Sequence, residues 1–237
     1  MIGRGYAAGR HTGQRIAARI WAALGKARSV VNIGAGSGSY EPPGRNVVAV
    51  EPSAVMRAQR PPSAAPCLAA AAESLPFADR CFGAAMSVLS DHHWADPLAG
   101  LAEMTRVARR VVVLQFDTSN PDRFWLTRDY LPEFAHLNRG VPTLTGRAAA
   151  IGARLETVPV PWDCADGFFH AYWRRPRAYL QPEVRQASSV WARVGPAAEQ
   201  RAVRKLADDL RFGRWAERNR EITSLSQMDL GARLLIA

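Results

Sequence analysis

The 237-residue chain is 48% hydrophobic, which is enough to build one large domain around a substantial core. Its apolar runs fall short of the roughly 18 to 20 residues that cross a bilayer, and its N-terminus lacks the apolar stretch of a signal peptide. We therefore expect a cytoplasmic protein with no membrane partner. The formal net charge of +10 comes almost entirely from arginines spread along the chain, so nucleic acid is not the expected partner.

Five apolar segments have the length and two-sided hydrophobicity of buried strands. They cover residues 29–33, 46–50, 67–72, 82–89 and 110–116. Helices are predicted at residues 14–24, before the first strand, and at residues 53–60 and 97–107, between later strands. The first crossover, residues 39–45, holds two prolines and a glycine and leaves room for little helix. Strands that alternate with helices predict an α/β fold with a doubly wound parallel sheet.

The pattern changes after Asp117. Residues 122–137 are aromatic and partly helical, and a helix at 145–152 precedes a strand at 155–160. A long helical stretch follows at residues 163–220, and the chain closes with a strand at 232–236. We expect a single domain over residues 1–237, in which residues 163–220 form a helical insertion that covers the active site.

Neither the cysteines nor the histidines have the spacing of a metal site. The three cysteines at positions 67, 81 and 164 are far apart, and they also fit no disulfide framework. Adjacent residues of a strand point to opposite faces, so the pair His92 and His93 would rarely share one ion. We expect reduced thiols and no bound metal.

The first predicted strand runs directly into a glycine-rich turn. This turn consists of Gly34, Ala35, Gly36, Ser37 and Gly38. Glycine lets the backbone turn tightly and approach a ligand without a Cβ atom in the way. A dinucleotide-binding turn would also need a glycine at position 39, where this chain has Ser39, and nicotinamide chemistry is therefore disfavoured.

Three further segments follow the ends of predicted strands. Glu51 ends the second strand, where a carboxylate can accept hydrogen bonds from both ribose hydroxyls of a nucleoside. The loop of residues 71–77 could present backbone groups and a small side chain to an adenine ring. Residues 87–94 extend from the fourth strand to His92, His93 and Trp94. Ligands of open α/β sheets bind at this carboxyl edge.

Together these four segments resemble the class I S-adenosylmethionine-dependent methyltransferases, specifically the small bacterial type in the ubiquinone-biosynthesis-like group. The resemblance covers about residues 6–117 and is weaker beyond them. It implies a Rossmann-like, mainly parallel sheet with an antiparallel final strand, and S-adenosylmethionine as the cofactor. The glycine-rich turn would contact the methionine part of the cofactor and Glu51 the ribose. The adenine would lie between Pro52 and Met56 and be capped by Ala72 and Glu73, while Ser87 and Val88 would pass beside the sulfonium.

The chain departs from the family pattern in three places. Asn32 stands where an aspartate is frequent in the family, so we expect the amino end of the cofactor to be recognised differently. Gly83 replaces the usual aspartate after Phe82, and the first crossover is unusually short and contains prolines. These departures affect individual contacts and leave the cofactor site in place.

His92 and His93 are the candidate catalytic residues, because an imidazole titrates near neutral pH and can remove a proton from the methyl acceptor. Asp91 and Asp117 are weaker candidates, and proximity alone, without a base, is an open alternative.

Three functions are compatible with these residues. The first is methyl transfer to a small molecule, such as a secondary metabolite. The second uses the same fold and cofactor without methyl transfer, as a cyclase or a regulatory binding protein. The third is methylation of RNA or protein.

Overall fold

The structure is a computed structural model that describes residues 9–237. Contacts between Cα atoms divide these residues into two compact units. The sheet unit comprises Gln14–Asp117, Val141–Val158 and Ala232–Ala237. The helical unit comprises the described residues up to Gly13, then Thr118–Gly140 and Pro159–Gly231. The helical unit is therefore larger than the expected insertion at residues 163–220, and the expectation that this insertion covers the active site stays a prediction.

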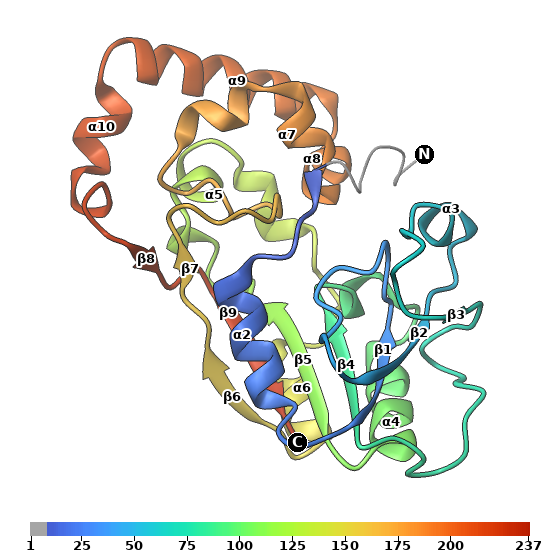
Figure 1. Cartoon of the computed structure of the whole chain (residues 1–237). Helices are drawn as coiled ribbons and strands as arrows, with labels where there is room; N and C mark the ends of the chain where they lie inside the picture. The colour runs from blue at the N-terminus through green and yellow to red at the C-terminus, as the bar shows by residue number, and fades with distance from the viewer. Residues whose placement is uncertain (1–8) are drawn as a thin grey trace. The chain divides into compact units, whose positions relative to one another are not determined.

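The sheet unit contains a seven-stranded sheet with the strand order β3-β2-β1-β4-β5-β9-β6 (Figure 1). The strands are β1 (Ser29–Ile33), β2 (Asn46–Val50), β3 (Cys67–Leu68), β4 (Ala84–Val88), β5 (Val111–Phe116), β6 (Arg154–Thr157) and β9 (Ala232–Ile236). The first five strands pair in parallel, whereas β9 is antiparallel to both β5 and β6. The predicted α/β fold with a mainly parallel sheet and an antiparallel final strand is thus confirmed.

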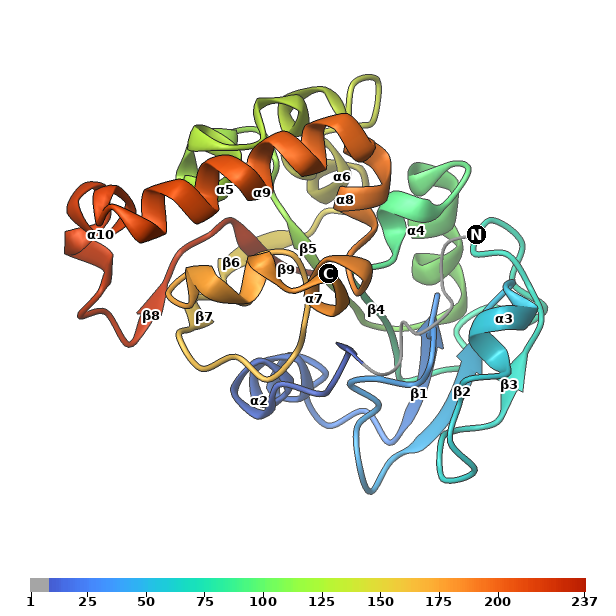
Figure 2. The same cartoon turned by 90° about the horizontal axis from the view of Figure 1, so that it is seen from above.

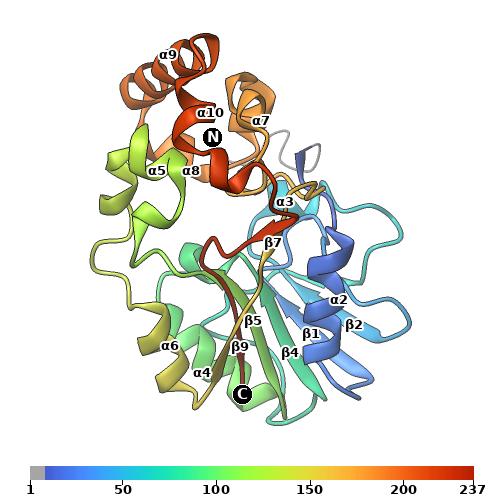
Figure 3. The ribbon, with the colours of Figure 1, turned by 90° about the vertical axis from the view of Figure 1, so that its left-hand side faces the viewer.

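Helices cover both faces of this sheet. Figure 3 shows α2 (Gln14–Ala23) on one face and α4 (Pro97–Val107) with α6 (Leu144–Ala150) on the other. Leu101, Met104 and Val107 recur on one side of α4 and pack into a fully buried core with Val31 and Val113 of the sheet. Burial on both faces explains why the central strands are continuous apolar runs rather than alternating ones.

Several element boundaries differ from the predicted ones. Helix α3 covers only Ala54–Arg57, and β3 only two residues of the predicted strand at 67–72. The predicted strand at 155–160 divides into β6, in the sheet, and β7 (Val160–Pro161), which pairs with β8 (Gln227–Met228) in the helical unit. Proline has no backbone N–H for a strand ladder, so Pro159 between the two strands accounts for this break.

The helical unit is built from short helices and one long one. Figure 2 shows the 16-residue helix α9 (Pro196–Arg211) leading into α10 (Arg214–Arg218). The unit also contains α5 (Trp125–Asp129), α7 (Pro182–Gln186), α8 (Ser189–Val194), β7, β8 and the 3-10 turns Pro121–Arg123, Pro132–His136, Pro176–Leu180 and Arg220–Ile222. No helix in the described part of the chain is long and apolar enough to cross a membrane.

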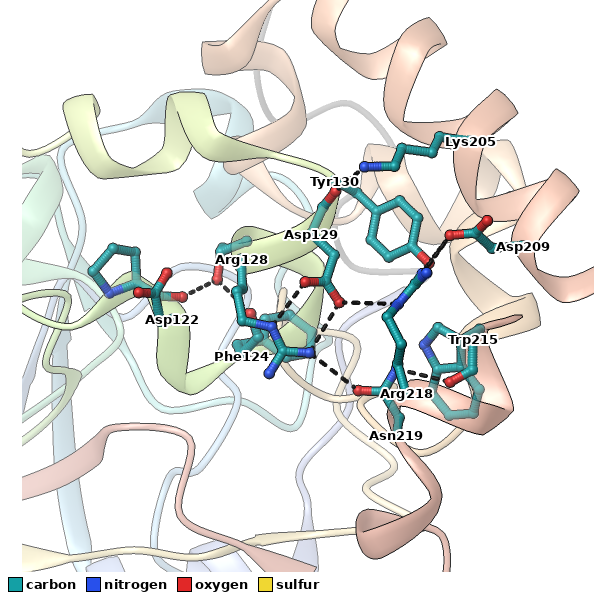
Figure 4. Close-up of polar contacts among 12 residues, drawn as sticks. Asp122, Phe124, Arg128, Asp129, Tyr130, Lys205, Asp209, Trp215, Arg218 and Asn219 are labelled. Atoms are coloured by element: carbon teal, nitrogen blue, oxygen red, sulfur yellow. Dashed lines mark hydrogen bonds and ion pairs between the residues drawn. The ribbon is translucent and has the colours of Figure 1, made fainter. Parts of the chain in front are cut away.

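A polar network joins α5, α9 and α10 within the helical unit (Figure 4). Asp209, which is only 4% exposed, accepts hydrogen bonds from the hydroxyl of Tyr130 at 2.9 Å, from Arg214 Nε at 2.6 Å and from Arg218. Burial would raise the pKa of Asp209, but the hydrogen bonds from Arg218, Arg214 and Tyr130 outweigh it and lower the pKa to about 2. The buried charge is therefore fully paired, as a buried carboxylate must be.

His170 lies among aromatic rings in the core of the helical unit. It is 7% exposed, and its ring centroid lies 5.0 Å from that of Phe124 and 5.2 Å from that of Phe169. Burial lowers the pKa of His170 to about 3, so the ring is uncharged at neutral pH.

This shift predicts a specific loss of stability in acid. Between about pH 6.5 and about pH 3 the unfolded chain binds a proton at His170 that the folded chain does not. The free energy of unfolding therefore falls by about 1.4 kcal/mol for each unit by which the pH is lowered through this range. Urea denaturation at several pH values measures this slope. We expect His170→Leu to be less stable than wild type at neutral pH but to lose less stability as the pH is lowered. The exposed control His136→Leu should keep the slope of wild type. Equal slopes for wild type and His170→Leu would contradict the assignment.

Candidate active site

The glycine-rich turn follows β1 and requires its glycines. Gly34, Gly36 and Gly38 have φ values of +65°, +54° and +97°, which side chains other than glycine rarely adopt. The N–H groups of Gly34 and Ala35 donate to the carbonyl of Val50 at 2.9 and 3.1 Å, which ties the turn to the end of β2. A Cβ atom on Gly34 would lie 1.8 Å from the hydroxyl oxygen of Ser90, so the turn is in close contact with the segment that follows β4.

Glu51 connects the glycine-rich turn with the segment after β2. It is 7% exposed, and its two carboxylate oxygens accept hydrogen bonds from the N–H groups of Gly36 and Ser53, both at 2.9 Å. A carboxylate offers about four lone-pair positions, so both oxygens keep capacity for a ligand hydroxyl. Met56, on α3, also approaches the turn, with its Cε 3.3 Å from the place of a Cβ on Gly36. Pro52 is exposed between Glu51 and α3.

Arg60 and Glu41 stabilise the turn, and no local pattern in the sequence indicates this role for either residue. The Arg60 guanidinium donates to the carbonyl of Gly36 at 3.3 Å, to that of Ala65 at 2.8 Å and to Glu41 Oε1 at 2.7 Å. Glu41 also receives the Asn32 amide at 3.5 Å, so a carboxylate lies beside the position where the family pattern has an aspartate. Residues 39–45 contain no helix, as expected, and this ion pair supports the turn where a crossover helix is missing.

The loop after β3 lies against the N-terminus of α4. Glu73 accepts a hydrogen bond from the N–H of Asp96 at 3.1 Å, and Asp96 in turn caps α4 through the N–H groups of Leu98 and Ala99. Ala72 is buried, with its Cβ 3.2 Å from the place of a Cβ on Gly100. Whether these two residues cap an adenine ring stays a prediction.

The segment after β4 carries the remaining predicted residues. Ser87 is fully buried, and its hydroxyl has no hydrogen-bond partner among residues 9–237, whereas Val88 is half-buried. Leu89 has a φ of +53°, a left-handed conformation that turns the chain sharply away from the strand. The indole N–H of Trp94 donates to the hydroxyl oxygen of Ser90 at 3.2 Å, which places this turn beside Gly34.

His92 and His93 follow in the 3-10 turn Asp91–His93, with ring centroids 3.9 Å apart. His92 is half-buried and His93 exposed. Asp91 is fully buried and forms an ion pair with Arg147 of α6 at 2.5 Å, while Gln115 of β5 contacts both Asp91 and His92. The structure thus brings His92 into one network with two residues that sequence reasoning did not single out. His170, by contrast, lies in the core of the other unit.

Comparisons with known proteins identify the family. Residues 31–114 match the family model described as "Methyltransferase domain". A candidate methyltransferase from an antibiotic biosynthesis pathway of Anabaena variabilis is 31% identical, with 97% of this chain and 98% of that chain covered and a TM-score of 0.88. The chain belongs to the class I S-adenosylmethionine-dependent methyltransferases. Its cofactor is accordingly S-adenosylmethionine.

More distant structures share the fold alone. Geranyl diphosphate C-methyltransferase from Streptomyces coelicolor is 16% identical over 94% of this chain and 79% of its own, with a TM-score of 0.52. The [4+2]-cyclase SpnF is also 16% identical, over 96% and 82%, with a TM-score of 0.50. No curated protein sequence matches this methyltransferase. Because the same fold carries two different chemistries, the methyl acceptor must be argued from the site.

The residues of this methyltransferase fit its cofactor. The glycine-rich turn can bring bare backbone close to a ligand, because three of its five residues are glycines with positive φ. Glu51 supplies a buried carboxylate that can receive ribose hydroxyls, and the hydroxyl of Ser87 is a polar group without a partner in the described chain. Within residues 9–237 no group of three His, Cys, Asp or Glu side chains is placed to hold a metal ion.

Proposed function

We propose that this enzyme transfers a methyl group to a small-molecule acceptor in secondary metabolism. The observation that carries the proposal is the similarity, over nearly the whole length of both chains, to a candidate methyltransferase from an antibiotic biosynthesis pathway. The cofactor supplies an activated methyl group on a sulfonium, so the protein must mainly hold the acceptor in line and exclude water.

The proposed cofactor contacts come from the four segments that meet at the carboxyl edge of the sheet. Glu51 would accept the ribose hydroxyls, and the turn at residues 34–38 would approach the methionine part. Pro52, Met56, Ala72 and Glu73 would surround the adenine, and Ser87 and Val88 would lie beside the sulfonium. The proximity of Gly34 to Ser90 supports this arrangement, because it shows that the turn and the segment leading to His92 and His93 share one edge.

We propose His92 and His93 as the catalytic pair that contacts the acceptor. Their place after β4 supports the proposal, since ligands of open α/β sheets bind beyond the carboxyl ends of the strands. The arginines also favour a small molecule over RNA. Several have internal roles, such as Arg45, which donates to the carbonyls of Ala27 and Trp21, and Arg110, which donates to the carbonyl of Ala23.

Two measurements test the proposal. Isothermal titration calorimetry of the full chain with S-adenosylmethionine should show saturable binding, and an absence of binding at high micromolar concentration would overturn the cofactor assignment. A labelled-methyl assay with panels of small hydroxyl, amine and carbon nucleophiles should give labelled product. Binding without transfer to any acceptor would favour a cyclase or a regulatory protein, and labelling of RNA or protein alone would replace the small-molecule acceptor.

A further inference from the structure

We propose that Gln115 holds His92 in the tautomer that carries its proton on Nε2, so that His92 contacts the methyl acceptor as a hydrogen-bond donor. The assignment of that contact rests on the proposed function. The tautomer itself follows from hydrogen bonds within the sheet unit, among residues of β5, α6 and the turn Asp91–His93.

The orientation of the Gln115 amide is fixed by its neighbours. Its oxygen, Oε1, accepts a hydrogen bond from the N–H of Phe116 at 2.8 Å. Its nitrogen, Nε2, faces Asp91 Oδ1 and lies 2.9 Å from His92 Nδ1. Turning the amide over would place its oxygen against the Asp91 carboxylate and its nitrogen against the backbone N–H of Phe116. Both contacts would be repulsive, so only one orientation satisfies the surroundings.

This orientation determines where the proton of His92 lies. An amide nitrogen has two hydrogens to donate and accepts no hydrogen bond. With one hydrogen directed at Asp91 and the other at His92, the ring nitrogen Nδ1 must be the acceptor. A neutral imidazole whose Nδ1 accepts carries its hydrogen on Nε2. Gln115 is therefore a positioning residue that acts through His92.

Arg147 pairs with Asp91 and so favours the charged carboxylate, which accepts the hydrogen bond from Gln115. The Arg147 guanidinium donates through Nη1 to Asp91 Oδ2 at 2.5 Å and through Nε to the carbonyl of Pro142 at 3.0 Å. Asp91 is fully buried and the side chain of Arg147 only 8% exposed, so this ion pair is shielded from water, and Asp91 Oδ1 is left to accept from Gln115. A charged Asp91 requires a donor from Gln115, which leaves the second amide hydrogen for His92.

The tautomer gives His92 and His93 different roles toward the acceptor. His92 cannot remove a proton at Nε2, because this nitrogen already carries one, but it can donate to a lone pair on the acceptor. The inference therefore favours an acceptor with an oxygen atom, such as a carbonyl or phenolate oxygen, within reach of the methylated centre. A deprotonation step, where the acceptor requires one, falls to the exposed His93, whose ring lies beside that of His92.

Nitrogen-15 NMR of the full chain, labelled at histidine and without an acceptor, tests the tautomer independently of methyl transfer. The His92 signals are assigned by their loss in His92→Gln. We expect long-range couplings that identify Nε2 as the protonated nitrogen and Nδ1 as the bare one at neutral pH and above. A neutral His92 protonated on Nδ1 would overturn the inference.

Gln115→Glu gives a second, opposite expectation. The new carboxyl group keeps one proton, which it donates to Asp91, so it has no hydrogen left for His92. His92 Nδ1 should then become the donor, and the tautomer should reverse or the ring become protonated. We expect kcat to fall about tenfold or more while the affinity for S-adenosylmethionine stays within about twofold. The exposed control Gln200→Glu should leave the His92 spectrum and kcat unchanged. An unchanged His92 spectrum in Gln115→Glu would overturn the inference. If the expected spectra are found but no acceptor is methylated, the tautomer is supported and only the proposed function is contradicted.

Discussion

Replacing Glu51 with alanine is expected to weaken S-adenosylmethionine binding by about 100-fold, or about 2.8 kcal/mol at 1.4 kcal/mol per tenfold change. The variant removes the acceptor proposed for the ribose hydroxyls. It also leaves the N–H groups of Gly36 and Ser53 without their carboxylate, and each hydrogen bond to a charged group contributes about 1.5 to 3 kcal/mol. Calorimetry on wild type and variant measures the loss.

Two companion variants separate charge from shape at this position. Glu51→Gln keeps the size of the side chain, but its amide nitrogen must face one of the two backbone N–H groups, so we expect an intermediate loss of about tenfold. Glu217→Ala, at an exposed position of α10, should bind the cofactor as wild type does. Wild-type affinity in Glu51→Ala would show that the ribose is held by other residues.

Gly34→Ala is expected to abolish measurable cofactor binding and to lower the melting temperature. A left-handed backbone costs an alanine about 1 to 2 kcal/mol. The added methyl group would also lie 1.8 Å from the Ser90 hydroxyl oxygen and 2.7 Å from its Cβ, so either the turn or the segment after β4 must move. Thermal denaturation and calorimetry on the same samples measure the two effects.

Gly44→Ala is the matched control, because Gly44 has a similar φ of +71° and no described atom lies within 4 Å of the place of its Cβ. This variant should lose only the stability that a left-handed backbone costs an alanine, and it should still bind the cofactor. Adding Ser90→Gly to Gly34→Ala should restore part of the stability, since it removes the colliding side chain. If Gly34→Ala and Gly44→Ala behave alike, the contact between the turn and Ser90 has no role in the site.

Much of the fold was predictable from local patterns. The mainly apolar runs at residues 29–33 and 46–50 correspond to β1 and β2 without a change of boundary, because inner strands of a parallel sheet are mostly apolar along their length. The third strand was overestimated, since only Cys67 and Leu68 pair with β2. The strand at 155–160 was wrong as a single element. A hydrophobic pattern reports burial, and it does not report which partner covers the segment, so it cannot locate a break at Pro159.

The candidate site divides in the same way. The turn at residues 34–38 and Glu51 could be found because backbone conformation and strand ends leave local signals in the sequence. The partners of Arg60 and Gln115 could not be found in this way. Arg60 acts on Gly36 from 24 residues away. Gln115 is polar in an otherwise apolar strand, but its partner His92 lies 23 residues away in the chain.

By itself, the sequence determined the α/β class and the four segments that meet at the edge of the sheet. The antiparallel final strand was predicted from the resemblance to a family. Only the tertiary structure decided which atoms these segments bring together. It placed Gly34 against Ser90, and it joined Arg147, Asp91, Gln115 and His92 into one hydrogen-bonded network. The physical reason is that hydrogen bonds require particular atoms within about 3 Å and in alignment. Periodicity and composition constrain where a segment lies, whereas donors and acceptors find their partners only once the chain has folded.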